Sequence, residues 1–128
     1  MNIYLLLAGI LSFVLVLGHS LRGEWVGERR LVKRITKLRL FDEDEKDVHA
    51  KRVVRVAWHV PSFAWAGIGA VFFYAAFITM STPVSVIIRI IAIAFLMSAV
   101  FSVIVNRGRH ASWVLFLLTA ILAWAGAG

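Results

Sequence analysis

Residues 19–59 read HSLRGEWVGERRLVKRITKLRLFDEDEKDVHAKRVVRVAWH, and they form the hydrophilic part of an otherwise apolar chain. All seven acidic residues of the protein and eleven of its fourteen basic residues lie in this stretch. Hydrophobic residues make up 61% of the 128 positions, whereas soluble domains contain about 45–50% apolar residues. The composition therefore predicts a small polytopic membrane protein whose charged stretch lies in the aqueous phase.

The apolar runs around the charged stretch predict an all-α fold with four transmembrane helices. A hydrocarbon core of about 30 Å requires roughly 20 helical residues at about 1.5 Å per residue. The expected spans are about residues 1–18, 57–80, 84–105 and 111–125. No internal repeat or linker divides the chain, so residues 1–128 are expected to form a single membrane domain.

The middle of the charged stretch predicts an additional amphipathic helix from Gly23 to Phe41, lying in the membrane surface between spans one and two. An apolar stripe runs opposite a basic face that suits anionic lipid headgroups. The stripe contains Leu31, Val32, Ile35 and Leu38, and the basic face contains Arg29, Arg30, Lys33, Arg34 and Lys37. The acidic cluster that follows predicts a turn and the start of the helix that leads into span two.

Small residues at helical spacing predict which faces of the spans pack together. Span one is expected to turn Ala8, Ser12, Leu15 and His19 into the bundle. Span two offers a stripe of Ser62, Ala66 and Ala70 for close helix contact. Within span two, Pro61 is expected to produce a kink, and a short turn at Ser81, Thr82 and Pro83 should join spans two and three into an antiparallel hairpin.

The distribution of Lys and Arg predicts the orientation in the membrane. Cytoplasmic connections are enriched in basic residues, and the 19–56 loop is strongly basic. The connection between spans three and four contains Arg107 and Arg109, whereas both termini and the 81–83 turn contain no Lys or Arg. We therefore expect a multi-pass protein of the cell inner membrane with a cytoplasmic charged loop and both termini outside.

The charge and the amino-acid content exclude several functional classes. A net charge of +7 without the aromatic and basic motif of a nucleic-acid reader is explained by membrane topology and by contact with anionic headgroups. The chain has no cysteine, which excludes disulfides, thiolate metal sites and a cysteine nucleophile. None of the expected spans contains the acidic residue that a cation-coupled transporter needs, and four spans would enclose a path only in a homo-oligomer.

Three histidines are expected at the cytoplasmic ends of different spans. His19 ends span one, His59 begins span two and His110 begins span four. The carboxylates of Glu24 and Glu28 follow His19 within one or two helical turns. Imidazole and carboxylate ligands suit Zn or Fe, and a site with three protein ligands and an open position can activate water. This convergence predicts a divalent metal site with Glu24 or Glu28 as ligand or general base, and with Asn106 beside it.

Three alternatives to the metal site remain. Histidine rings are amphipathic and occur at membrane interfaces without binding a ligand, so all three can have a purely structural role. Two histidines on facing helices at one depth can also bind haem as axial ligands. The third alternative is a scaffold without enzymatic activity, whose basic helix binds acidic lipids or a protein partner. His49 lies farther out on the second helix, and the sequence assigns it no role.

Arg89 is the lone charged residue inside an expected span. Charged residues at membrane depth are candidates for function by default. Arg89 lies about two turns from the outer end of span three, so its long side chain is expected to reach the headgroups. Binding of an anionic ligand or cofactor by Arg89 is the alternative.

Two short motifs resemble a group of small bacterial inner-membrane proteins of unassigned function. The motifs are Gly18-His19-Ser20-Leu21-Arg22-Gly23-Glu24 and Ala57-Trp58-His59. The resemblance covers the first two spans and implies no particular activity. It draws attention to His19, Glu24 and His59.

Overall fold

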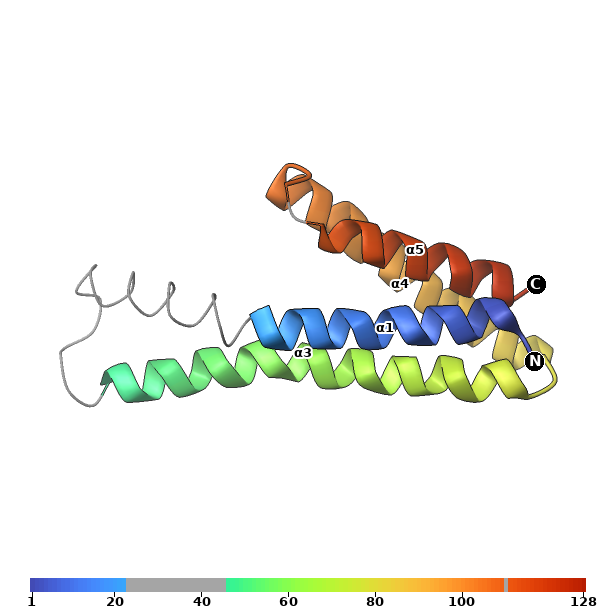
Figure 1. The fold of residues 1–128 in the computed structure, drawn as a ribbon, viewed down its shortest axis with the longest axis horizontal. Helices are drawn as coiled ribbons and strands as arrows, with labels where there is room; N and C mark the ends of the chain where they lie inside the picture. Colours follow the sequence, from blue (N-terminus) through green and yellow to red (C-terminus); the bar gives the residue numbers. More distant parts are fainter. Residues whose placement is uncertain (23–45, 110) are drawn as a thin grey trace. The chain divides into compact units, whose positions relative to one another are not determined.

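The computed structural model of the protein describes residues 1–22, 46–109 and 111–128. These residues form four helices and no strand, in the order α1 (Ile3–Arg22), α3 (Lys46–Phe77), α4 (Thr82–Asn106) and α5 (Ser112–Gly126). The described part of the chain is therefore all-α, as predicted (Figure 1). The amphipathic helix predicted from Gly23 to Phe41 lies outside the described residues.

Three of these helices are long and apolar enough to cross a membrane. The apolar segments are Ile3–Leu21, His59–Phe77 and Thr82–Asn106, whereas α5 is an apolar helix of only 15 residues. Large apolar side chains also cover the outer surface, where Phe63 is 75% exposed and Phe101 is 69% exposed. Helices that are apolar on all sides are typical of membrane spans.

Local sequence explains where the helices begin and end. Between α3 and α4 only residues 78–81 are not helical, and Pro83 occupies the first turn of α4, where a missing backbone N–H costs nothing. At the other end of α4, Arg107 and Gly108 adopt φ values of 50° and 71°, and the Gly108 N–H donates to the Val103 carbonyl at 3.0 Å. This left-handed pair ends the helix. Pro61 lies inside α3.

The chain divides into two compact units. Unit 1 contains Met1–Leu15 and Trp65–Gly128, and unit 2 contains Val16–Ala64. Unit 1 holds most of α1, the second half of α3 and all of α4 and α5. The described residues of unit 2 are the end of α1 and the first part of α3.

In each helix of unit 1, a series of buried residues recurs at alternating intervals of three and four residues. They are Leu5, Ala8, Ser12 and Leu15 in α1, Gly69, Phe72 and Ala76 in α3, Ile88, Ala92, Phe95, Ala99 and Ser102 in α4, and Phe116, Ala120 and Ala123 in α5. This spacing keeps one face of a helix against its neighbours along its whole length. The face predicted for Ala8, Ser12 and Leu15 is confirmed.

Glycines allow α1 and α3 to approach closely in unit 1, where the two helices lie side by side (Figure 1). A Cβ atom on Gly9 would lie 3.0 Å from the Phe73 ring, and a Cβ atom on Gly69 would lie 3.1 Å from the Phe13 ring. The Phe13 and Phe73 rings contact each other with centroids 5.7 Å apart. An aromatic ring of each helix therefore packs against a glycine of the other helix.

Asn2 forms hydrogen bonds to the first turn of α1 and to the last turns of α3 and α5. Its side-chain amide donates to the Gly126 carbonyl at 2.8 Å, and its backbone N–H donates to the Ala76 carbonyl at 2.7 Å. The Asn2 Oδ1 atom accepts from the Leu5 N–H at 3.3 Å. Ser85 adds α4 to this group, because its hydroxyl donates to the Ala127 carbonyl. Both termini therefore lie at the same end of unit 1 (Figure 1).

Candidate functional site

The histidine-bearing turns of α1 and α3 are neighbours in unit 2. The Ser20 hydroxyl donates to the Ser62 hydroxyl at 3.1 Å, and Ser62 is only 2% exposed. His19 directly precedes Ser20, and His59 lies three residues before Ser62, slightly less than one helical turn. Both histidines are half-buried. The hydrogen bond thus joins the turns that contain two of the three predicted metal-binding histidines.

The other predicted ligands lie outside the described residues. These are Glu24, Glu28 and His110. Among the side chains that the structure describes, no three from His, Asp or Glu gather as a metal ligand set. The described residues therefore supply two candidate ligands, His19 and His59, and a complete site needs at least one more from the segments that are not described.

The hydrogen bonds of Asn106 are formed with residues at the C-terminal end of α4. It is the last residue of α4, and its side-chain amide donates to the Ser102 carbonyl at 3.1 Å. Beyond it, the Arg109 N–H donates to the Asn106 carbonyl at 3.0 Å. Asn106 is exposed. These contacts account for its local role, and the predicted place beside a metal site stays a prediction.

Arg89 contacts an aromatic ring on the neighbouring helix. Its guanidinium carbon lies 5.7 Å from the centre of the Trp124 ring, within the range of cation–π attraction. Arg89 lies in the first half of α4 and Trp124 in the last turn of α5. The short connection between these helices makes them antiparallel, so both residues lie toward the same end of unit 1. This pair was not predicted from the sequence, because counting residues outward from the connection leaves Arg89 and Trp124 more than one helical turn apart in depth.

Hydroxyl groups in the interior of unit 1 are fully used by the packing. Ser12 donates to the Ala8 carbonyl at 3.0 Å, and Thr119 donates to the Leu115 carbonyl at 2.8 Å. Ser102 and Ser112 share a hydrogen bond of 3.0 Å between α4 and α5. Among the described side chains, no buried nitrogen or oxygen atom lacks a hydrogen-bond partner. An apolar interior demands such pairing, and these hydroxyls are explained by structure alone.

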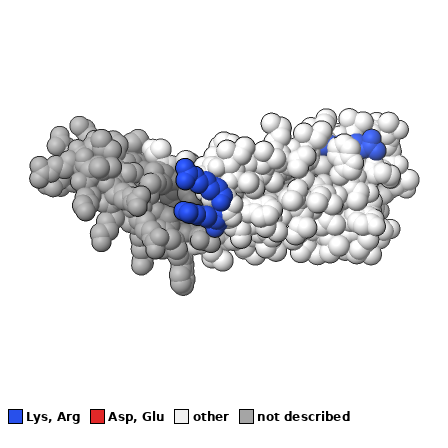
Figure 2. Space-filling model, turned by 90° about the horizontal axis from the view of Figure 1, so that it is seen from above, with Lys and Arg blue, Asp and Glu red and all other residues white. Residues whose placement is uncertain are grey.

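The charged side chains that the structure describes are all basic. They belong to Arg89, Arg107 and Arg109. Figure 2 shows Lys and Arg in separate places on this face and no acidic side chain among the described residues. Arg107 and Arg109 follow the end of α4, whereas Arg89 lies near its start. Arg89 is therefore the only charged residue within α4 and the only position on this helix that attracts an anion by its charge.

Comparisons with known proteins give no relative of this chain. No protein-family model matches it, and no curated protein or solved structure shows significant similarity.

Proposed function

We propose that this chain is an integral membrane protein that binds a divalent metal ion through His19 and His59 at the membrane face. The observation that carries the proposal is the Ser20–Ser62 hydrogen bond of 3.1 Å between the two histidine-bearing turns. Two imidazoles on adjacent helices form half of a common zinc or iron ligand set. Both rings are half-buried, which suits a site that is open to the aqueous side.

The remaining ligands are proposed from residue chemistry. His110 supplies a third imidazole, and Glu24 supplies a carboxylate. A divalent ion held there would supply Lewis-acid activation of a water molecule. Whichever of Glu24 and Glu28 does not hold the ion would serve as the general base for that water. Asn106 completes the surroundings of the site, and the reaction class is hydrolytic.

The site requires a particular topology, with four spans and both termini outside the inner membrane. Three helices meet the length requirement, whereas the 15 residues of α5 cover only about 22 Å of a core of about 30 Å. Local thinning of the bilayer can accommodate a short span at modest cost. The joining of Asn2 to Gly126 supports an even number of crossings, because it holds both termini at one end.

Reporter fusions are expected to confirm this topology. A periplasm-dependent phosphatase fused after Gly128 should be active, and a fluorescent protein that folds only in the cytoplasm should stay dark there. The same two reporters inserted after Glu45 should show the reverse, because this loop is strongly basic. A fluorescent C-terminal fusion would contradict the proposed orientation.

Elemental analysis of the purified protein tests the metal site. We expect Zn or Fe in stoichiometric amount after purification in mild detergent without chelator. His19→Ala and His59→Ala should each lower metal affinity by about 100-fold or more, since each change removes a ligand and exceeds the 10–100-fold effect of losing an outer-shell partner. His49→Ala is the matched control, because it removes the fourth histidine of the chain, which lies outside the proposed ligand set.

Four outcomes would argue against the metal assignment. Protein that remains metal-free when Zn, Fe, Mn and Ni are offered in turn has no such site. Equal metal content in the His19→Ala and wild-type proteins would place the ion elsewhere. A Soret band after haem supplementation, lost in the His59→Ala variant, would assign the same histidines to haem. Vesicle binding that needs the basic face of residues 29–37, in protein without metal, would favour the scaffold alternative.

A further inference from the structure

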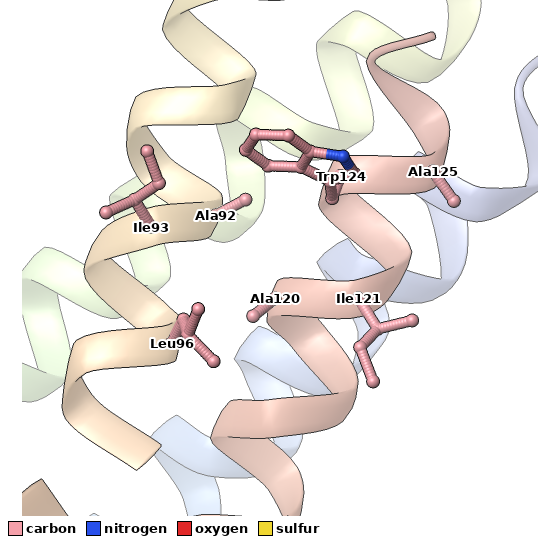
Figure 3. Close-up of a pocket in the computed structure, with 7 residues that line it drawn as sticks. All are labelled: Ala92, Ile93, Leu96, Ala120, Ile121, Trp124 and Ala125. Carbon is pink, nitrogen blue, oxygen red and sulfur yellow. The ribbon is translucent and has the colours of Figure 1, made fainter. Parts of the chain in front are cut away.

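An apolar groove runs along the surface of unit 1 between α4 and α5 (Figure 3). It has a volume of about 320 Å³, at the small end of the range of about 300–1,000 Å³ for ligand pockets. Two buried alanines, Ala92 and Ala120, form its floor, because their short side chains leave space between the helices. Exposed side chains form its walls: Ile93 and Leu96 from α4 and Ile121 from α5.

The groove has one cationic end. The indole of Trp124 lies across the space between the two helices at one end of the groove (Figure 3). The Arg89 guanidinium lies 5.7 Å from the centre of that ring. Because Arg89 is exposed, its charged group is accessible to a ligand as well as to the indole. Stacking on an aromatic face leaves the in-plane N–H groups of a guanidinium available as donors.

The direction of the groove matches that of a phospholipid in a bilayer. Arg89 follows the start of α4 by seven residues, or about 10 Å, which places it near the boundary between headgroups and acyl chains. The groove residues of α4 run from Ala92 to Leu96, about 6 Å along the helix toward its middle, compared with about 15 Å for one leaflet of the hydrocarbon core. A cation at the interface and an apolar channel running inward fit a phosphate and an acyl chain respectively.

We infer that this groove binds an anionic phospholipid of the surrounding bilayer, with the phosphate on Arg89 and one acyl chain between α4 and α5. Arginine recognises phosphate through two parallel N–H···O bonds, which fix position as well as charge. The headgroup rests beside Trp124, and the chain lies along Ala92 and Ala120. This site is independent of the proposed metal site, because it uses none of the same residues.

Charge complementarity favours a lipid over a second copy of the chain. All seven acidic residues of the protein lie between Glu24 and Asp47, outside the apolar segments Ile3–Leu21, His59–Phe77 and Thr82–Asn106. A second copy packed along this groove would therefore bring no carboxylate from its own apolar spans to the depth of Arg89. The phosphate of an anionic lipid lies at that depth.

Lipid titration followed by native mass spectrometry tests the site. The full-length protein in nonionic detergent is titrated with phosphatidylglycerol and, separately, with phosphatidylcholine of the same acyl chains. We expect the first bound phosphatidylglycerol to bind about tenfold more tightly than phosphatidylcholine, a difference of about 1.4 kcal/mol. Both lipids carry a phosphate, but the choline cation of phosphatidylcholine neutralises it, whereas phosphatidylglycerol keeps a net negative charge that Arg89 attracts. Arg89→Gln should abolish this preference, and Arg89→Lys should retain part of it.

Matched variants separate the two parts of the site. Arg107→Gln removes an equal charge from the other end of α4 and should leave the first binding event unchanged. Leu96→Trp keeps the charge but narrows the groove, so it should weaken both lipids alike. Far-UV circular dichroism checks that each variant is as helical as the wild type.

Fluorescence quenching locates the bound lipid and does not require any Arg89 variant to fold. Phosphatidylglycerol with brominated acyl chains should quench the emission contributed by Trp124, obtained as the difference between the wild-type and Trp124→Phe proteins. Unquenched Trp124 emission at saturating lipid would overturn the assignment. Equal phosphatidylglycerol affinity in the wild-type and Arg89→Gln proteins would also overturn it. So would a wild-type dimer that Arg89→Gln converts to a monomer without changing the number of bound lipids.

Discussion

Replacing Phe72 by alanine is expected to lower the free energy of unfolding by about 3–5 kcal/mol. Phe72 is fully buried in α3, and its ring lies 6.2 Å from that of Phe95 in α4. Phe95 in turn contacts Phe116 of α5 at 6.0 Å, and Trp65 of α3 contacts Phe116 at 5.3 Å. Removing the first ring leaves a cavity where three helices meet. In lipid or detergent, helix association depends on van der Waals packing, so this loss is felt directly.

Thermal unfolding in one detergent measures this effect. A loss of about 3 kcal/mol should lower the melting temperature by roughly 10 °C in a chain of this size. Phe63→Ala is the matched control on the same helix, because Phe63 is 75% exposed and its loss should change stability by less than about 0.5 kcal/mol. Similar shifts for the two variants would contradict the described packing of α3.

Gly126→Ala is expected to destabilise the protein by about 1–3 kcal/mol, although it adds only a methyl group. A Cβ atom at Gly126 would lie 2.7 Å from both Cγ and a Cδ atom of Leu5, which is itself fully buried. The Oδ1 atom of Asn2 would lie 3.2 Å away. The added methyl must therefore push α5 away from α1, and it strains the hydrogen bond of 2.8 Å from Asn2 to the Gly126 carbonyl.

Gly67→Ala adds the same methyl group in open space. No atom lies within 4 Å of a Cβ built on Gly67. Alanine is a better helix former than glycine by up to about 1 kcal/mol, so this variant should melt slightly higher than the wild type. The melting temperatures of the two variants should thus move in opposite directions. A rise in both would show that α1 and α5 do not approach closely at Gly126.

The packing face of α3 illustrates what a short sequence pattern misses. The stripe predicted from Ser62, Ala66 and Ala70 is correct at Ser62, which is 2% exposed, but Ala70 is exposed and Gly69 is buried in its place. Steps of four residues advance about 400° around a helix, so a strict i+4 series drifts about 40° per step. A step of seven residues drifts only about 20° in the other direction, which leads from Ser62 to Gly69.

The candidate metal site was only partly accessible from the sequence. The expectation that spans one and two approach each other near His19 and His59 follows from their short membrane lengths and antiparallel order. The Ser20–Ser62 hydrogen bond between the two turns depends on the rotation of both helices about their axes. No local pattern in the sequence indicates that rotation or a contact of Ser20. The parts played by Glu24, Glu28 and His110 stay predictions.

The sequence by itself determined the helical, membrane-compatible class of this protein and located the ends of its helices to within about four residues. Hydropathy, Pro83 and the Arg107-Gly108 turn act over a few neighbouring residues, so they can be read without knowing any partner. Only the tertiary structure decided that Asn2 bonds to Gly126, that Arg89 lies over Trp124, and that Ala92 and Ala120 leave a groove between α4 and α5. These contacts join residues far apart in the chain, and they depend on how each helix is rotated and shifted against the next.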